Sequence, residues 1–476
     1  MGDEIDTSEF SESDVSRFRQ RLTAETEYLS EMFTSEDFSS GGKSGIEIET
    51  CLVDDTYNPL CINDKFLKRL NDPLASAELA QFNVEINSSP RDLTGHFLNS
   101  TYVELTTMWR NFHEVAKEFD AKVLMIGILP TLDKNSLNLA NLSKLERYRA
   151  LNRETIRLRK GKPLKLDING VEHLSIIHRN VMLEAAATSF QIHLMLDPKK
   201  AHLYYNAALK LSSAMLALTA NSPFLFGKNI WSETRIPLFE QAVALGGFEG
   251  ATFGPIRRVS FGSRFIQHSL MELFSSNLDH YPILLPVNYD SKISELKHLR
   301  LHNGTIWRWN RPIVGFDELG QAHLRLEHRV IAAGPTIVDT IANMAFYHGA
   351  IVGLAELSSN DYDELDFGHA RDNFYKAAQF GLDATITTVN GTLCNIKTVL
   401  RDTLLPIAKL GLEKCNVAES DISEYLGVIE QRLANSTNGS QWQRSYQEKH
   451  QCDMHKLTKA YYERQQTGEP VHSWTI

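Results

Sequence analysis

The chain has 476 residues, of which 42% are hydrophobic and 23% charged, the composition of an ordinary globular protein. Lysine and arginine together number 49 and aspartate and glutamate 59, so the formal net charge is −10. A chain with this charge has no general attraction for nucleic acid or for an anionic membrane. We therefore expect neither as a partner, and an anionic substrate has to be held by local arginines and lysines or by metal ions.

The cysteines and the first residues bear on the compartment. Five cysteines are scattered along the chain without a CxxC pair, which is typical of a reducing compartment. The opening MGDEIDTSEFSESD has neither the basic nor the apolar stretch of a signal peptide. No run approaches the roughly 18 apolar residues that span a bilayer. The sequence predicts a cytoplasmic protein, with residues 3–14 as a solvated, mobile tail.

Taken in chain order, the hydrophobic pattern begins with a helix. Residues 12–34 carry apolar side chains at helical spacing, and the polar residues 35–44 predict a loop after that helix. Apolar and polar residues then alternate as in β-strands over 45–53, 82–87, 188–196 and 323–330. The continuous apolar run 123–128 predicts a strand that is buried on both faces.

Long helices are predicted between and after these strands. Asp197 followed by Pro198 predicts a helix start, and Asn221-Ser222-Pro223 predicts its end, because the residue before proline disfavours the α region. A second long helix follows Gly334-Pro335-Thr336, and the stretch 371–465 is mostly helical by pattern. No linker divides the chain, so we expect an N-terminal helix and loop over 1–44, a main body over 45–370, and a helical C-terminal region of the same domain over 371–476.

Four of the predicted strands place an unusual set of side chains on one face. Because side chains alternate along a strand, Glu47 and Glu49 point away from Ile46 and Ile48. The same alternation gives the polar positions of the other three strands: Asn83, Glu85 and Asn87; Gln191 and His193; and Arg325, Glu327 and Arg329. If the four strands share one sheet, four carboxylates and one imidazole meet beside arginines.

This set of side chains predicts a metal site. Hard divalent ions take oxygen ligands with an occasional histidine, and Mg²⁺ is usually held by a few carboxylates and substrate phosphates. We expect two or three Mg²⁺ ions, or Mn²⁺, and the phosphates of ATP to bind at Glu47, Glu49, Glu85, His193 and Glu327. For any single strand, a sheet face in contact with water explains the alternation as well. The four strands together favour the site, because solvent faces usually include lysine, threonine and serine.

Several segments resemble, in their order and spacing, the motifs of the glutamate–cysteine ligase type 2 family, also called carboxylate–amine ligases: GIEIET, FNVEINSSP, ATSFQIHL, LTANSPFLFG, TRIPLFE, NGTIWRWNRP and LEHRV, followed by FYKAAQFGLDA and TGEPVHSW. The resemblance runs from about residue 45 to the C-terminus. It implies an α+β, glutamine-synthetase-like catalytic fold, in which a curved antiparallel β-sheet forms a funnel with helices packed outside. Residues 45–370 would then be the catalytic body.

The resemblance also implies an activity. ATP, the co-substrate, would phosphorylate a carboxylate, typically the γ-carboxylate of glutamate. A small amine such as cysteine would then attack the acyl phosphate and give an amide. A homodimer is the candidate oligomer.

Residue by residue, the resemblance assigns metal ligation to Glu47, Glu49, Glu85, His193 and Glu327. Arg329 and Arg311 would be the catalytic arginines on phosphate or substrate, and Arg235 would bind the substrate carboxylate. We add Asn87, Gln191 and Trp307 as substrate-binding residues. The continuation LEHRVIAAG departs from the family, since many relatives carry an acid shortly after this arginine.

Other interpretations of single motifs are weaker. Gly42-Lys43-Ser44 is not a P-loop, because Asp37 stands where that motif needs glycine. Trp307-Arg308-Trp309 with Arg311 could stack the bases of single-stranded nucleic acid, but the net charge favours a half-buried strand. Two alternative functions stay open, namely a non-catalytic nucleotide or amino-acid sensor on the same fold and a small-molecule kinase built on that scaffold.

Overall fold

A curled antiparallel sheet organises the molecule, and the computed structural model describes it within residues 4–245, 257–357 and 364–476. The strands follow the order β11-β12-β8-β1-β3-β2, and β4 and β5 both pair with β1. Their bounds are β1 Lys43–Val53, β2 Ala75–Ala77, β3 Asn83–Asn87, β4 Arg91–Asp92, β5 Lys122–Leu124, β8 Ser189–Leu196, β11 Asn310–Phe316 and β12 Ala322–Ala332. The four alternating strands of the sequence therefore share one sheet, as predicted.

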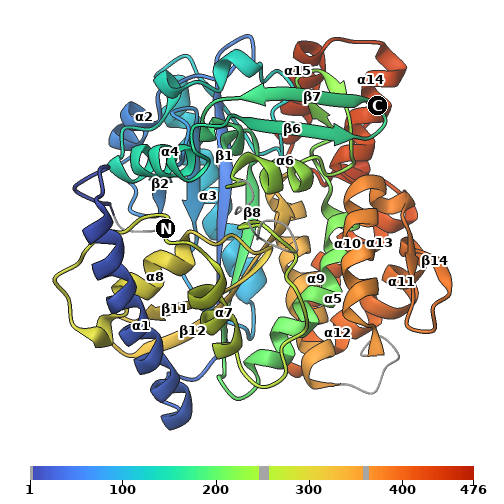
Figure 1. The fold of residues 1–476 in the computed structure, drawn as a ribbon. Helices are drawn as coiled ribbons and strands as arrows, with labels where there is room; N and C mark the ends of the chain where they lie inside the picture. Colours follow the sequence, from blue (N-terminus) through green and yellow to red (C-terminus); the bar gives the residue numbers. More distant parts are fainter. Residues whose placement is uncertain (1–3, 246–256, 358–363) are drawn as a thin grey trace.

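Helices cover this sheet and account for most of the remaining chain (Figure 1). The α-helices are α1 Glu12–Ser35, α2 Asn63–Leu70, α3 Phe97–Lys117, α4 Glu146–Leu158, α5 Ala201–Thr219, α6 Arg235–Ala242, α7 Met271–His280, α8 Lys297–Gly304, α9 Ile337–Glu356, α10 Phe367–Phe380, α11 Ile396–Val399, α12 Leu405–Lys414, α13 Glu419–Ala434, α14 Gly439–His450 and α15 Met454–Gln465.

Short elements complete the chain. The three two-stranded sheets pair β6 Leu164–Asn169 with β7 His173–His178, β9 Phe224–Leu225 with β10 Lys228–Asn229, and β13 Thr385–Thr387 with β14 Leu393–Asn395. The short helices are η1 Lys134–Ser136, η2 Leu139–Asn141, η3 Val181–Ala186, η4 Ile293–Glu295, η6 Gly381–Asp383 and η8 Val471–Ser473, and η7 Leu400–Leu404 is a π-helical turn.

Strand register decides which polar side chains meet. Glu49 of β1 lies directly opposite Glu85 of β3, and Glu47 lies opposite Gln191 of β8. His193 of β8 lies opposite Glu327 of β12. Residues paired in this way project from the same face of a sheet, so the predicted polar side chains gather on one surface.

The other face of the sheet is buried against helices. Ile48, Ile192 and Leu326 belong to one hydrophobic cluster with residues of α5 and α9, and α5 and α9 pack on each other. The same cluster includes Phe18 of α1 and Leu433 of α13, so its packing joins the N-terminal and C-terminal segments to the main body. Burial of this much apolar surface is the main force that holds the layers together.

Helix α9 is the most buried long helix in this layer. Thr336 caps its start by accepting a hydrogen bond from the backbone N–H of Asp339. By length and composition α9 could cross a membrane, contrary to the sequence expectation, but 94% of its apolar stretch is buried inside the protein. Its buried charge is also paired, since Asp339 forms a 2.8 Å ion pair with Arg432 of α13. These contacts are those of a core helix.

Two sequence expectations about local structure are wrong in part. The run 123–128 is buried, but only Lys122–Leu124 pairs as a strand. Beyond it, the backbone of Met125 bonds to side chains of α15: Gln465 accepts from its N–H at 3.1 Å, and Tyr461 donates to its carbonyl at 3.0 Å. The helix expected to begin at Asp197 begins at Ala201, after a turn in which the Asp197 side chain accepts a 3.0 Å hydrogen bond from the backbone N–H of Lys199.

Helices α9 and α12 touch through their backbones. A methyl group added at Gly411 of α12 would lie 1.9 Å from the carbonyl oxygen of Gly349 in α9. Alanine at Gly411 therefore forces the two helices apart, and we expect it to lower the free energy of unfolding by about 1–3 kcal/mol. Urea unfolding followed by circular dichroism measures this change.

Gly427 of α13 is the matched control, because a methyl group there has open space around it. Alanine at Gly427 should leave the stability unchanged or raise it by up to about 1 kcal/mol, through helix propensity alone. Equal effects of the two substitutions would contradict the close approach of α9 and α12.

Candidate active site

A cavity of about 300 Å³ opens on the polar face of the main sheet. All five predicted metal ligands line it, together with the predicted residues Arg311, Arg329, Gln191 and Trp307. The acidic side chains of its wall are Glu47, Glu49, Glu78, Glu85, Glu184 and Glu327, and the basic ones are Arg147, Lys297, Arg300, Arg311, Arg325 and Arg329. The cavity thus collects charges of both signs from strands, helices and loops that are far apart in the sequence.

One acidic group in this cavity includes the histidine. Glu47, His193 and Glu327 each offer a ligand atom, and these atoms lie within 4.8 Å of one another. His193 Nε2 is 3.0 Å from Glu47 Oε1 and 3.9 Å from Glu327 Oε1. Both ring nitrogens of His193 are buried and make no hydrogen bond within the described part of the chain. A buried nitrogen without such a bond beside two carboxylates fits a metal ligand.

A second acidic group has no basic member. Glu49, Glu78 and Glu85 also offer ligand atoms within 4.8 Å of one another. Like charges directly opposite on neighbouring strands repel, and Glu49 and Glu85 occupy such a pair. A divalent cation with oxygen ligands would balance this charge, so the residues present fit Mg²⁺ or Mn²⁺.

The two groups differ in their protonation when no cation is bound. Burial would raise the pKa of Glu47, but the neighbouring His193 lowers it to about 2. Burial likewise opposes ionisation of Glu327, yet Arg311 and Arg329 hold its pKa below the usual range. In the second group burial raises the pKa of Glu85 and brings that of Glu78 to about 8. The two carboxylates of the first group are therefore ionised at neutral pH, whereas the second group gains its full charge only with a counter-ion.

Two arginines hold Glu327 from opposite sides. Arg311 donates two hydrogen bonds to its carboxylate, each 2.8 Å long, in a bidentate pair. Arg329 donates to the same carboxylate at 3.0 Å and to Gln191 Oε1 at 2.5 Å. Such planar, always-charged groups suit phosphate or carboxylate oxygens. Both arginines line the cavity, so each can also reach an anionic ligand.

Uncharged neighbours orient the acids of the second group. Glu49 accepts hydrogen bonds from the Ser189 backbone N–H at 2.7 Å, from the Ser189 hydroxyl at 2.9 Å and from Gln191 at 3.0 Å. Asn87 donates to Glu85 Oε1 at 2.9 Å. Asn87 is not among the described residues of the cavity wall, so the structure gives it a positioning contact with Glu85 in place of the predicted contact with substrate.

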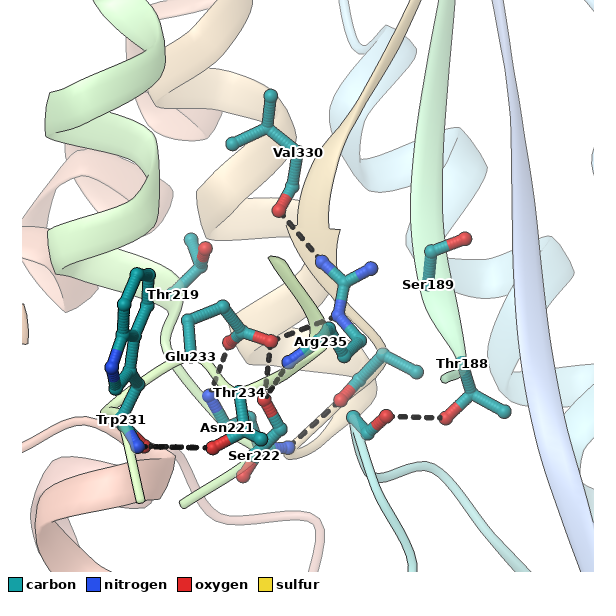
Figure 2. Close-up of polar contacts among 12 residues, drawn as sticks. Thr188, Ser189, Thr219, Asn221, Ser222, Trp231, Glu233, Thr234, Arg235 and Val330 are labelled. Carbon is teal, nitrogen blue, oxygen red and sulfur yellow. Dashed lines mark hydrogen bonds and ion pairs between the residues drawn. The ribbon is translucent and has the colours of Figure 1, made fainter. Parts of the chain in front are cut away.

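Arg235 also lies outside the cavity wall formed by the described residues. Figure 2 shows its guanidinium between Glu233 and the backbone of β12, with the Nε of Arg235 2.9 Å from Glu233 and a 2.7 Å hydrogen bond to the carbonyl of Val330. The side chain is 2% exposed. Its placement does not support the predicted contact with a substrate carboxylate. Burial raises the pKa of Glu49, and the positive charge of Arg235 only partly opposes that rise.

In the segment Trp307-Arg308-Trp309, the last two side chains are buried inside the protein. Arg308 donates to Asn277 at 2.6 Å, and the indole of Trp309 donates to Glu240 at 3.1 Å. Both side chains are buried, which leaves no open surface for stacking nucleic-acid bases. Trp307 alone of the three lines the cavity.

Six charged residues of the wall were not predicted as site residues: Glu78, Glu184, Arg147, Arg325, and Lys297 and Arg300 of α8. Glu78 follows β2 in a loop, Glu184 lies in η3 and Arg147 lies in α4, so no period-two pattern marks them. Arg325 is different, because its alternation with Glu327 and Arg329 was visible in the sequence. Burial lowers the pKa of Arg325, and the nearby charges of Glu47 and Glu327 only partly oppose that effect.

The N-terminal tail also reaches the cavity, contrary to the expectation that it is solvated. Ile5 is 4% exposed and belongs to the cavity wall. The side chain of the preceding Glu4 accepts a 2.6 Å hydrogen bond from the backbone N–H of Glu146 at the start of α4. The remaining described residues of the tail are exposed or half-buried.

Comparisons with known proteins agree with this geometry. The glutamate-cysteine ligase family 2 (GCS2) model matches residues 43–463. No curated protein matches the chain. Among solved structures, the glutamate–cysteine ligase of Francisella tularensis in complex with AMP has 12% sequence identity and a TM-score of 0.54, over 92% of this chain and 90% of that one.

A bifunctional glutathione synthetase from Pasteurella multocida has 10% identity and a TM-score of 0.50, and the match covers 93% of this chain but only 54% of that longer protein. At identities this low, the likeness to these two structures shows a shared fold and nothing more specific. The α+β, glutamine-synthetase-like fold expected from the sequence is thereby confirmed. Because the family match spans most of the sequence, the chain belongs to glutamate–cysteine ligase family 2 and is a ligase of the ATP-dependent, glutamate–cysteine ligase-like class.

Proposed function

We propose that this enzyme joins a glutamate carboxylate to a small amine through an acyl phosphate, with ATP as the phosphoryl donor and Mg²⁺ at both acidic groups. The observation that carries the proposal is the convergence of two three-ligand groups on one cavity that Arg311, Arg325 and Arg329 also line. A site for two anionic substrates needs this combination of carboxylates for cations and arginines for phosphate and carboxylate.

The cavity has a more basic end, which suits the nucleotide. Arg325 lies among Arg300, Arg311 and the carboxylates of Glu47 and Glu327, all of which act on its pKa. Glu47, His193 and Glu327 would hold the cation on the phosphates, while Arg311 and Arg325 would neutralise the phosphate charge. Phosphoryl transfer needs this positioning and charge neutralisation more than a protein nucleophile. A cation held by these residues would supply positive charge to the phosphates and so favour attack on the phosphorus.

The first chemical step transfers the phosphoryl group. A carboxylate oxygen of glutamate forms a bond to the γ-phosphorus while the bond from that phosphorus to the β-phosphate oxygen breaks, which releases ADP. Arg329 lies between Glu327 and Gln191, and its charge partly opposes the rise that burial causes in the pKa of Glu49, so it lies between the two acidic groups. Its guanidinium would hold the carboxylate near the transferring phosphate and stabilise the negative charge of the transition state.

The second step forms the amide. The amine nitrogen attacks the acyl carbon, the bond from that carbon to the phosphate oxygen breaks, and inorganic phosphate and one proton leave. Glu184 is the one wall carboxylate, among the described residues, outside the two groups of potential metal ligands. We assign it the attraction of the incoming ammonium, which must lose a proton before the nitrogen can attack.

The direct test is an assay with MgATP, glutamate and a panel of amines, with the product identified by its mass. We expect ADP and phosphate to be released only when both the carboxylate and an amine are present. ATP binding without turnover across the panel would indicate a sensor. A stable phosphorylated product that forms without an amine would indicate a small-molecule kinase.

Replacing Glu327 tests the first acidic group. Glu327→Gln removes a metal ligand and leaves Arg311 and Arg329 without their shared carboxylate, so we expect kcat to fall at least about 100-fold. Glu318→Gln, in the exposed turn between β11 and β12, is the matched control and should keep full activity. Thermal unfolding of both variants shows whether the fold is intact. An unchanged kcat in a folded Glu327→Gln protein would remove this residue from the metal site.

The pH dependence of metal binding tests the second group. Burial raises the pKa of Glu78 and of Glu184 from 4.5 to about 8. In the metal-free protein these carboxyls contribute stability that is complete below about pH 4.5 and is lost as the pH rises through about 8. Because a bound cation requires ionised carboxylates, we expect excess Mg²⁺ to raise the melting temperature more at pH 8.5 than at pH 6.

The double variant Glu78→Gln/Glu85→Gln should lose most of this pH-dependent stabilisation, because it lacks two of the three ligands. A stabilisation by Mg²⁺ that is equal at the two pH values in the unmodified protein would count against a cation at this group.

A further inference from the structure

The two ends of the cavity differ in their apolar walls. Leu299 and Val314 of the wall belong to the hydrophobic cluster under the main sheet. The other buried apolar side chains of the wall belong to a second cluster: Ile5, Leu79, Tyr148, Leu151 and Leu285. These five side chains, which share the cavity wall and one hydrophobic cluster, are the second apolar surface of the cavity.

This second apolar surface lies beside Glu78 and Glu184. Leu79 directly follows Glu78 in the chain, and Tyr148 is close enough to Glu78, Arg147 and Glu184 for their charges to act on its hydroxyl. By contrast, Arg300, Arg311 and Arg325 gather around Glu327. The apolar surface therefore belongs to the end of the cavity away from the arginines that suit the nucleotide.

The segment that contributes Ile5 lies outside the part matched by the family, which begins at residue 43. Glu4 and Glu9 attach this segment to α4, through the 2.6 Å hydrogen bond to Glu146 and a 2.7 Å ion pair with Arg153. Helix α1 is attached to α8 through Glu25. Its carboxylate accepts a 2.8 Å hydrogen bond from the backbone N–H of Leu299, and its Oε1 lies 2.7 Å from His298 Nδ1. The segment thus runs between two helices that both line the cavity.

The chemistry of this end indicates its ligand. The carboxylate of Glu184, which lies outside the two metal groups, attracts an ammonium group, whereas the aliphatic side chains of the second apolar surface give no partner to a charged or strongly polar side chain, which would lose its hydration there. The free α-carboxylate of glutamate would be poorly placed against Ile5, Leu151 and Leu285. An amine with an apolar side chain fits this end of the cavity, because its nitrogen would lie near the carboxylate and its carbon chain would contact the aliphatic side chains.

We propose that this end of the cavity binds the acceptor amine, that this amine carries an apolar side chain larger than that of alanine, and that Ile5 is a residue that determines its size. The inference rests on the proposed ligase function and names the class of amine. Ile5 is well placed for this role because it enters the wall from a segment whose neighbours are exposed, so the wall depends on this one side chain at that point.

The experiment compares kcat/KM for glycine, alanine, cysteine, valine, leucine and phenylalanine, with MgATP and glutamate, in the full-length enzyme. Each methylene that fits an apolar pocket raises kcat/KM about 10-fold or more. We expect leucine to exceed alanine by at least about 10-fold. Ile5→Ala should shift the preference toward phenylalanine, and Ile5→Asp should lower kcat/KM for leucine at least about 10-fold while KM for ATP changes less than about 2-fold.

Two further variants show whether the effect of the Ile5 substitutions comes from lost contact with the amine or from a weakened attachment of the N-terminal segment. Leu151→Ala enlarges the same surface from α4 and should produce a similar shift toward the larger amine. Asp6→Ala changes an exposed neighbour of Ile5 and should leave the ranking of amines unchanged.

The outcomes distinguish this inference from the function on which it rests. Absence of product with every amine refutes the ligase proposal itself. Product formation with cysteine or glycine preferred, and with a ranking that neither Ile5→Ala nor Leu151→Ala alters, refutes only the inference about the amine. An increase of KM for ATP in these variants, without a change in ranking, would mean that the apolar surface holds the adenine base and would also overturn the inference.

Discussion

Repulsion among buried carboxylates is the constraint on which the rest of this structure depends. The register of β1 and β3 puts Glu49 directly opposite Glu85, and Glu78 lies beside them. In an apolar surrounding such charges are tolerated only when they are neutralised, by protons or by cations. The fold therefore accepts a local cost to stability at this face, as is common where a site is built for binding and catalysis.

The two acidic groups meet this constraint differently. The protein supplies its own positive charge to the first group, through His193 beside Glu47 and the two arginines on Glu327. The second group has hydrogen-bond donors, from Ser189, Gln191 and Asn87, but no cation within the group of three. The first group is thus pre-ordered in the free enzyme, and the second depends on what binds.

From its period-two pattern, the sequence could predict only those site residues that lie on strands, because side chains alternate between the two faces of a strand. Alternation identified Glu47, Glu49, Glu85, His193 and Glu327, because period two fixes the face of a side chain even when its partner strands are unknown. Glu78, Glu184 and Ile5 reach the same cavity from a loop, a 3-10 helix and the N-terminal segment, where no period-two alternation shows the direction of a side chain. The order of the family's motifs suggested Arg235, but a motif does not say whether a side chain points into a cavity or, as here, into the packing behind it.

The run at 123–128 illustrates the same limit and has a consequence for how the molecule is made. Its backbone is completed by Tyr461 and Gln465, and Gly127 of the run accepts a hydrogen bond from the N–H of Thr188, the neighbour of the Ser189 that orients Glu49. Since α15 follows every residue of the acidic face in the chain, a partly synthesised chain contains all the predicted metal ligands before it contains Tyr461 and Gln465. The backbone behind the acidic face therefore has its full set of hydrogen-bond partners only once residues 454–465 have been added and have folded against it.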